Sequence, residues 1–316
     1  MDFVQKREST VTTYSELAQT QGGGIPAKDR WGTAEYGGKF VVVYSDPDLT
    51  WDVFTTRMIG NFRVRGLSEN DAIKIADFGG GDGVLLDTLT RQLTDKGYLE
   101  VTGVNFDVNA QHLGTMKSKF SSENVGLGRS LHAVRAGVTN LPLPFGSIDA
   151  GCSRFVVQYL NPIIQGTAIQ EMFATLKPGA ELIIQWPRAS TTSSEAAVLD
   201  DFDANIDAIL TDVPVDEVKG NRHLLSIEEM RDIADKIGAS HEIGLIDGCK
   251  MYISAEAYID RFNVTDVSKI EHLKALFNDA FFKQRLRDIP SVELSEENNR
   301  TYIAFTIGIA ALSRPV

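Results

Sequence analysis

The segment IADFGGGDGVLL, residues 75–86, contains the residue types best suited to bind a ligand in this chain of 316 residues. One carboxylate, Asp77, precedes four glycines, Gly79, Gly80, Gly81 and Gly83, and an apolar run resumes after them. Glycine permits positive φ angles and lets a ligand approach the backbone closely, and the first N–H groups of a helix have no partner within it. The segment therefore predicts a ligand-binding turn between a strand and a helix, with N–H donors near Gly79 to Gly81.

Three glycine patterns are candidates for this turn. A phosphate-binding P-loop requires Lys and then Ser or Thr after its last glycine, but Val84 and Leu85 follow here. A dinucleotide-binding G-x-G-x-x-G pattern requires Gly or Ala at position 84, so the valine argues against a nicotinamide oxidoreductase. The pattern D-x-G-x-G-x-G matches residues 77–83 without a gap.

Three further segments accompany the glycine pattern: LPLPFGS at 141–147, IDAGCSRFVVQYL at 148–160 and LKPGAELII at 176–184. Together the four segments resemble the class I S-adenosylmethionine-dependent methyltransferases, over about residues 70–190 and more loosely over 226–253. The resemblance implies S-adenosylmethionine as cofactor. It also implies that the glycine turn lies along the methionine and ribose of that cofactor, with Asp77 near the ammonium group.

The sequence departs from the family at the end of the second core strand, GVNFD. The family usually has an Asp or Glu there that binds both ribose hydroxyls, whereas this chain has Asn105. Asp107 is two residues further on the same strand face and is either the ribose ligand or the N-cap of the next helix. Between them, Phe106 is expected to stack near the adenine.

A second departure follows the third core strand, in RAGVTNLP. The family usually has an acid there that contacts the adenine amino group, and the corresponding place holds Gly137 or Val138. Recognition of the adenine then falls to the loop backbone with Thr139 or Asn140. The two departures keep open a catalytically silent or repurposed protein of the same fold that binds S-adenosylmethionine.

Methyl transfer from a sulfonium is an in-line displacement, which requires a positioned acceptor and exclusion of water more than a strong base. Where a base is needed, His223 is the best-placed histidine. Arg154, Phe155 and Tyr159 follow the fourth strand, with Arg154 a candidate anchor for an acidic substrate group, and Tyr36 is similar in kind to aromatic residues that close over the methyl group in related enzymes. No cluster has the spacing of metal ligands, so we expect no metal.

These residues need a scaffold, and apolar runs alternate with helical ones from residue 72 onward. We predict an α/β, Rossmann-like fold: a mostly parallel seven-stranded sheet with helices on both faces, an N-terminal arm and helical lid insertions. The predicted parts are an arm or lid at 1–65, a cofactor-binding core at 66–190 and 223–316 with a helical insertion at about 254–298, and a helical lid insertion at 191–222. Lids of this kind belong over the carboxyl edge of the sheet.

Composition narrows the partners. The formal charge of −12 argues against a nucleic acid partner, and the segment SRFVVQYL lacks the Asn/Asp-Pro-Pro-Tyr/Phe tetrad of DNA amino-methylating relatives. No segment is apolar and long enough to span a bilayer, so we expect a cytoplasmic protein without membrane contact. The predicted acceptor is a small molecule. Protein or tRNA methylation is the nearest alternative, and a homodimer stays open.

Overall fold

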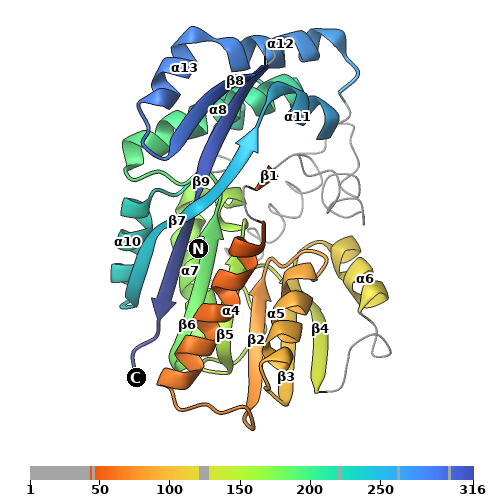
Figure 1. The fold of residues 1–316 in the computed structure, drawn as a ribbon, viewed down its shortest axis with the longest axis vertical. Helices are drawn as coiled ribbons and strands as arrows, with labels where there is room; N and C mark the ends of the chain where they lie inside the picture. Colours follow the sequence, from red (N-terminus) through yellow and green to blue (C-terminus); the bar gives the residue numbers. More distant parts are fainter. Residues whose placement is uncertain (1–42, 45–46, 121–127, 220–222, 262–263, 298–299) are drawn as a thin grey trace, which may run out of the picture.

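The computed structural model describes residues 43–44, 47–120, 128–219, 223–261, 264–297 and 300–316. Most of the predicted N-terminal arm, including Tyr36, therefore lies outside the described residues. The remainder is one twisted sheet with helices on both faces and a second group of helices at one end (Figure 1).

The sheet has nine strands among the described residues, in the order β1-β7-β9-β6-β5-β2-β3-β4, with β8 paired to β9. The five strands from β6 to β4 in this order are mutually parallel, whereas β9 is antiparallel to β6, β7 and β8. The strands are β1 (Val43–Tyr44), β2 (Ala72–Phe78), β3 (Glu100–Asp107), β4 (Arg129–Arg135), β5 (Ile148–Arg154), β6 (Leu176–Trp186), β7 (Ser240–Ile253), β8 (Val292–Glu297) and β9 (Arg300–Ser313).

The predicted Rossmann-like fold is confirmed, but the predicted count of seven strands is wrong. The two additional strands are β1, which has only two residues and pairs with β7, and β8, which forms an antiparallel pair with β9. The segment VELSEE of β8 lies inside the predicted helical insertion at 254–298, and its acidic end obscured the strand alternation of Val292 and Leu294. Pairing with β9 stabilises this segment as a strand, since strand propensity depends strongly on context.

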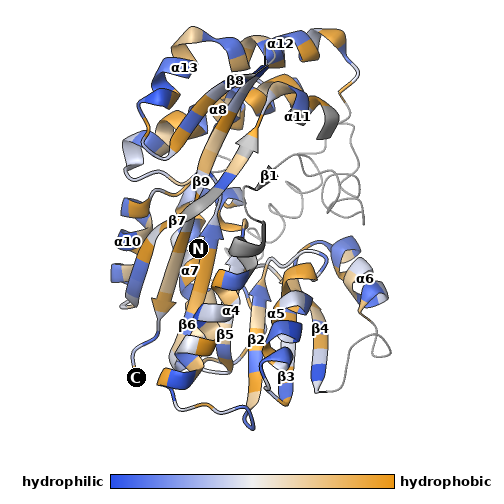
Figure 2. Ribbon diagram, in the orientation of Figure 1, coloured by the Kyte–Doolittle hydropathy of each residue, from blue (hydrophilic) through white to orange (hydrophobic). Residues whose placement is uncertain are grey.

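Two apolar layers cover the sheet. On one face, α4 (Pro47–Val64) and α5 (Val84–Asp95) pack on the central strands through Phe54, Met58, Phe62 and Leu89. On the other face lie α7 (Pro162–Ala174) and α10 (Ile227–Lys236). Figure 2 shows the resulting pattern: the strands are mostly apolar, and the helices that cover them carry both apolar and polar residues. The described part of the predicted arm is thus tied to the sheet: β1 pairs with β7, and α4 packs against one face.

Helix ends follow local sequence signals. A capping box forms at the start of α10, where Ser226 and Glu229 bond reciprocally. Two other helices are α6 (Ala110–Lys119) after β3, and the one-turn 3-10 helix η1 (Val157–Tyr159) after β5. Among the described residues, no helix is both long enough and apolar enough to cross a membrane.

A second apolar core lies above the carboxyl ends of the parallel strands (Figure 1). Its elements, which we call the cap, are α8 (Ser193–Thr211), α9 (Val215–Val218), α11 (Ala255–Arg261), α12 (Val267–Asn278), α13 (Ala280–Arg287) and β8. The acid-rich helix α8 has an apolar face that is buried there through Phe202 and Ile206. Buried Arg188, just after β6, joins the cap to the sheet by an ion pair with Asp203 of α8.

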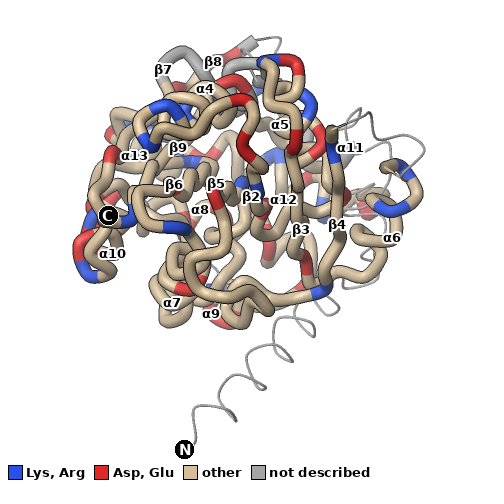
Figure 3. Tube along the Cα trace, turned by 90° about the horizontal axis from the view of Figure 1, so that it is seen from below, with Lys and Arg blue, Asp and Glu red and all other residues tan. Residues whose placement is uncertain are grey.

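Charged residues are mixed along the described chain. In the view of Figure 3, Lys and Arg positions alternate with Asp and Glu positions on the same elements. Examples of local pairs are Arg57 with Glu242 and Lys119 with Asp82. Nucleic-acid-binding proteins usually present a continuous basic stripe to the phosphate backbone, and charges mixed in this way do not form one.

Candidate functional site

The glycine turn joins β2 to α5 at the carboxyl edge of the sheet, as the sequence predicted. Its N–H groups, however, do not face outward: Gly79 and Gly80 donate to the Phe106 carbonyl at 2.7 and 3.3 Å. Gly81 donates to Oδ2 of Asp107 at 3.0 Å. The prediction that these three N–H groups serve a ligand is therefore wrong for this geometry, because β3 accepts all three bonds.

The glycines instead remove bulk from the turn. A Cβ at Gly80 would overlap Oδ1 of Asn105 and Oδ2 of Asp77. Gly81 has φ +56°, a region that β-branched residues avoid, and a Cβ there would come within 3.9 Å of Nδ1 of His112 only. Gly79, Gly80 and Gly81 are half-buried, so the backbone of the turn is accessible where side chains are absent.

Asp77 lies below this turn and is completely buried. Neither of its carboxylate oxygens accepts a hydrogen bond from a described residue. Burial raises the pKa of Asp77 to about 7. Its neighbour on β5 is Cys152, whose thiol donates to the Ala76 carbonyl at 3.4 Å. The thiol also lowers the pKa of Asp77, but less than burial raises it, and a thiol is a weak donor. A buried carboxylate with so weak a neighbour is costly, and a bound cation would reduce that cost.

The end of β3 is tied to the turn by two side chains. Asn105 donates through Nδ2 to the Gly81 carbonyl at 2.8 Å and contacts the Met116 sulfur at 3.2 Å. Asp107 accepts from Gly81 N through one oxygen and from Asn109 N, at 2.7 Å, through the other. The N-cap of α6 is Asn109, whose side chain accepts from Gln111 N, so the N-cap alternative for Asp107 is wrong.

The neighbouring strand and loop complete this side of the site. Phe106 points to the opposite sheet face, where its ring stacks on that of Phe78 with centroids 5.7 Å apart. The loop after β4 contains buried Val138 and half-buried Thr139, and Ala136 N donates to the Asp107 carbonyl at 3.1 Å. The loop predicted to meet the adenine is therefore held beside the end of β3.

The other side of the site is the end of β5. Phe155 has φ +57°, and its N–H donates to the Gln185 carbonyl at 2.9 Å, so the chain leaves the strand one residue after Arg154. The Arg154 guanidinium lies 4.4 Å from the centroid of the Phe155 ring. Tyr159 ends η1 and is half-buried, whereas Gln158 beside it is buried with no hydrogen bond to its amide from a described residue.

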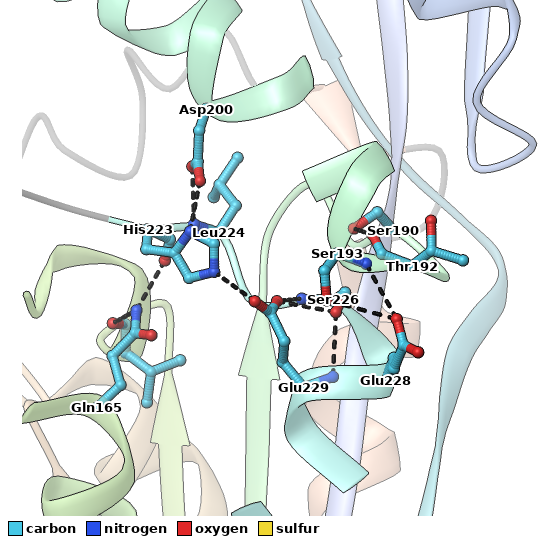
Figure 4. A network of polar contacts seen from close by, with 11 residues as sticks. Gln165, Ser190, Thr192, Ser193, Asp200, His223, Leu224, Ser226, Glu228 and Glu229 are labelled. Carbon is cyan, nitrogen blue, oxygen red and sulfur yellow. Dashed lines mark hydrogen bonds and ion pairs between the residues drawn. The ribbon is translucent and has the colours of Figure 1, made fainter. Parts of the chain in front are cut away.

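His223 lies in a different environment, between the cap and α10 (Figure 4). Its ring nitrogens bond Oδ2 of Asp200, on α8, at 2.5 Å and Oε1 of Glu229, on α10, at 2.9 Å. The hydrogen bond to Asp200, and then that to Glu229, raises the pKa of His223 to about 10. An imidazolium that donates through both nitrogens has no lone pair for a substrate proton, so this geometry does not suit the predicted base.

Two residues of this region escaped the sequence analysis. His112 was not among the candidate residues, but the first turn of α6 places it against the glycine turn, 3.7 Å from Asp107. Arg188 has φ +53° and donates to the Tyr258 hydroxyl besides pairing with Asp203. The helical spacing after Asn109 could have placed His112 on the inner side of α6, together with Met116.

Comparisons with known proteins agree with this architecture. Residues 75–179 match a family model described as a methyltransferase domain. A ubiquinone/menaquinone biosynthesis C-methyltransferase, UbiE, of Vibrio parahaemolyticus is 29% identical over 111 residues, which are 35% of this chain and 40% of the relative. The protein of the same name from Shewanella sediminis is 27% identical over 150 residues, 46% of this chain and 57% of the relative. The match thus spans about half the length of these curated relatives.

Solved structures show the same fold at low identity. A candidate methyltransferase of Bacillus halodurans superposes with a TM-score of 0.59 at 14% identity, over 83% of this chain and all of that one. Phosphoethanolamine N-methyltransferase 2 of Haemonchus contortus, in complex with S-adenosylhomocysteine, gives a TM-score of 0.51 at 14% identity, over 96% of this chain and 60% of that one. Residues 75–179 are therefore a methyltransferase domain, on the fold of the class I S-adenosylmethionine-dependent methyltransferases that the sequence predicted.

Proposed function

We propose that this protein transfers the methyl group of S-adenosylmethionine to a small-molecule acceptor enclosed between the sheet edge and the cap. The observation that carries the proposal is the fully buried Asp77 below the glycine turn, which has only the Cys152 thiol beside it to offset its charge and lies within the part of the chain that matches a methyltransferase domain. The cofactor carries an ammonium group, which is a suitable partner for that carboxylate.

The cofactor would lie across the ends of β2, β3 and β4. Asp77 would hold the ammonium, and the backbone of Gly79–Gly83 would lie along the methionine and ribose. Gly80 keeps this backbone close to Asp77 and Asn105, since a Cβ at that position would overlap both side chains. The loop that holds Val138 and Thr139 begins beside Asp107, whose carbonyl accepts from Ala136 N, and this position suits the nucleoside end. Phe106, which stacks on Phe78 on the opposite face of the sheet, would hold the end of β3 in place under the nucleoside. The residues therefore fit the cofactor.

The acceptor would approach from the end of β5. When bound, the cofactor supplies an electrophilic methyl group, and the chain has to hold the acceptor in line with it and keep out water. Arg154, Phe155, Gln158 and Tyr159 lie at this position, under the cap. The buried amide of Gln158 supports an acceptor with polar groups, because its own donors and acceptor have no partner among the described residues.

His223 would act at a distance from the reacting atoms. Its bonds to Asp200 and Glu229 join α8 of the cap to α10 of the core, and Gln165 Nε2 donates to the carbonyls of both His223 and Val157, at 2.8 and 3.0 Å (Figure 4). His223 thereby fixes the cap over η1. We propose that it positions the acceptor pocket.

A small-molecule acceptor is also supported by the names of the relatives, which act in ubiquinone and menaquinone biosynthesis. Transfer to a protein or tRNA is the nearest enzymatic alternative. Asn105, where the family usually has an acid, keeps open a protein that binds the cofactor without using it.

Calorimetry with S-adenosylmethionine, S-adenosylhomocysteine and NADH tests the cofactor, and incubation of the protein with labelled S-adenosylmethionine and fractionated metabolite extracts tests the acceptor. We expect both sulfur nucleosides to bind, NADH not to bind, and label to enter a small-molecule fraction. Binding of NADH alone would overturn the proposal. Binding without any transfer would favour the silent alternative, and label in protein or RNA would identify a macromolecular acceptor.

A further inference from the structure

Asn105 is committed to holding the glycine turn. Its amide nitrogen donates to the Gly81 carbonyl at 2.8 Å, a bond that a carboxylate could not make. A Cβ on Gly80 would overlap both Oδ1 of Asn105 and Oδ2 of Asp77, so these two oxygens face the same point of the turn. An acid at position 105 would place two buried carboxylates next to each other, which like-charge repulsion disfavours. Position 105 therefore serves the turn.

His112 is the neighbouring side chain without a role in the fold. It is 8% exposed, and neither ring nitrogen has a hydrogen bond from a described residue. Its Nδ1 faces the turn, 3.9 Å from where a Cβ on Gly81 would lie. A buried polar group without a partner keeps the cost of its lost contact with water. This cost suggests that a ligand supplies the missing partner.

Asp107 orients this histidine. Its two oxygens are held by the N–H groups of Gly81 and Asn109, and Oδ1 lies 3.7 Å from Nδ1 of His112. The carboxylate has remaining lone pairs beyond these two bonds. His112 and Asp107 thus form a polar pair at the carboxyl end of β3, one strand along from Asp77.

The order of the strands predicts which part of the cofactor meets this pair. With the ammonium of the cofactor at Asp77 on β2, the molecule extends over β3 towards the loop after β4. In S-adenosylmethionine the ribose follows the amino-acid tail, so the ribose would lie above β3. A neutral imidazole has one donor and one acceptor, and each ribose hydroxyl offers both.

We propose that His112, positioned by Asp107, hydrogen-bonds a ribose hydroxyl of the bound cofactor. The assignment rests on the proposed function and adds a cofactor-binding residue at a position that the sequence pattern did not indicate. This bond would give the buried ring of His112 a hydrogen-bond partner. It would also replace the ribose contact that Asn105 does not make while its amide holds the Gly81 carbonyl.

A cycle of ligand and protein changes tests this bond. The dissociation constants of S-adenosylhomocysteine and of its 2′-deoxy and 3′-deoxy analogues would be measured by calorimetry for the unaltered protein, His112→Phe and His112→Gln. The unaltered protein should bind one deoxy analogue about 3- to 10-fold more weakly than the parent. His112→Phe should bind the parent more weakly by a similar factor and should not distinguish it from that analogue. His112→Gln, with a donor and an acceptor, should recover part of the affinity.

The matched control is His132→Phe, because His132 is exposed on β4; it should bind all three ligands as the unaltered protein does. Thermal unfolding of each variant would verify that it is folded. Equal affinity of His112→Phe and the unaltered protein for S-adenosylhomocysteine would overturn the assignment. It would also be overturned if the loss of affinity from His112→Phe and the loss from removing the hydroxyl multiplied when combined, because the two groups would then act independently. Failure of the unaltered protein to bind S-adenosylhomocysteine would overturn the proposed function as well.

Discussion

Two buried aspartates lie at opposite edges of the same sheet and have opposite surroundings. Asp149, at the amino end of β5, is 1% exposed and is bonded by Arg65, Lys177 and the N–H of Lys74. Asp77, at the carboxyl end of β2, is fully buried and bonded by no described residue. The fold satisfies the Asp149 carboxylate, whereas the Asp77 carboxylate is the one that we propose binds the cofactor. The amino edge is therefore built for stability, and the carboxyl edge for binding.

The same contrast separates the two histidines of interest. His223 donates from both nitrogens to carboxylates that join α8 to α10. His112 has no hydrogen bond from a described residue and faces the glycine turn. Buried polar groups are nearly always paired in native proteins. His112 and Asp77 both lack a hydrogen bond from a described residue at the carboxyl edge, which supports the proposal that the cofactor binds there.

Gly81→Val tests the binding edge with the largest expected effect. A β-branched residue at φ +56° costs about 1–2 kcal/mol of strain and would place a side chain in the space above the turn. We expect binding of S-adenosylmethionine to be abolished in calorimetry while the circular dichroism spectrum of the fold is retained.

Gly66→Val is the control for Gly81→Val, since Gly66 has φ +73° with nothing within 4 Å of its Cβ position and lies before β2, at the amino edge. It should carry similar strain and bind the cofactor normally. Unchanged affinity in Gly81→Val would show that the ligand lies elsewhere.

Asp77→Asn separates binding from stability. Loss of the charged bond to the ammonium should weaken binding about 10- to 100-fold at pH 8. Because the pKa of Asp77 is raised to about 7, the affinity of the unaltered protein should rise with pH through 7, and that of the variant should stay flat over this interval. Calorimetry from pH 6 to 8.5 would measure both.

Stability should move in the opposite direction. A carboxyl with a folded pKa raised from 3.8 to about 7 gives its stabilising contribution below pH 3.8 and loses it as pH rises through 7. Asp77→Asn should therefore unfold at a higher temperature than the unaltered protein at pH 8, and the difference should vanish in acid. A variant that is destabilised at pH 8 would show that Asp77 is held by partners within the fold.

Asp149→Asn is the matched change at the satisfied edge. It weakens the bonds from Arg65 and Lys177, and the expected loss is about 2 kcal/mol in the free energy of unfolding, with no change in cofactor affinity. Denaturant unfolding and calorimetry would measure the two quantities. If Asp149→Asn weakened binding as strongly as Asp77→Asn, the contrast between the two edges would be incorrect.

The sequence predicted the strands and the glycine turn well because their signals are local. The alternation expected from residue 72 onward begins with β2, and the segment GVNFD is the end of β3, as predicted. Partners across the chain were not predictable. The engagement of the Gly79–Gly81 N–H groups depends on β3, and the pairing of His223 depends on Asp200, 23 residues away on α8.

The strand β8 shows the same limit. The alternating residues of β8 form a strand because β9 pairs with them in antiparallel orientation. This pairing depends on the position of β9 in the folded protein, which the local sequence of β8 does not contain. The position of His112 was missed for a related reason, since the inner side of a short helix is determined by how the helix packs. Sequence patterns thus predicted the turn, and only the fold brought its polar neighbours together.

The smallest expected effect is that of His223→Gln, which tests whether a satisfied histidine is structural. The two carboxylates raise the folded pKa of His223 from 6.5 to about 10, so their stabilisation is fully present below pH 6.5 and is lost as pH rises through 10. Because the ring is partly exposed, we expect the variant to lose about 1 kcal/mol in the free energy of unfolding at pH 6. The loss should shrink towards pH 10 in denaturant titrations. Looser attachment of α8 should raise KM for the acceptor more than it lowers kcat, whereas a loss confined to kcat, without a loss of stability, would instead support the base predicted from the sequence.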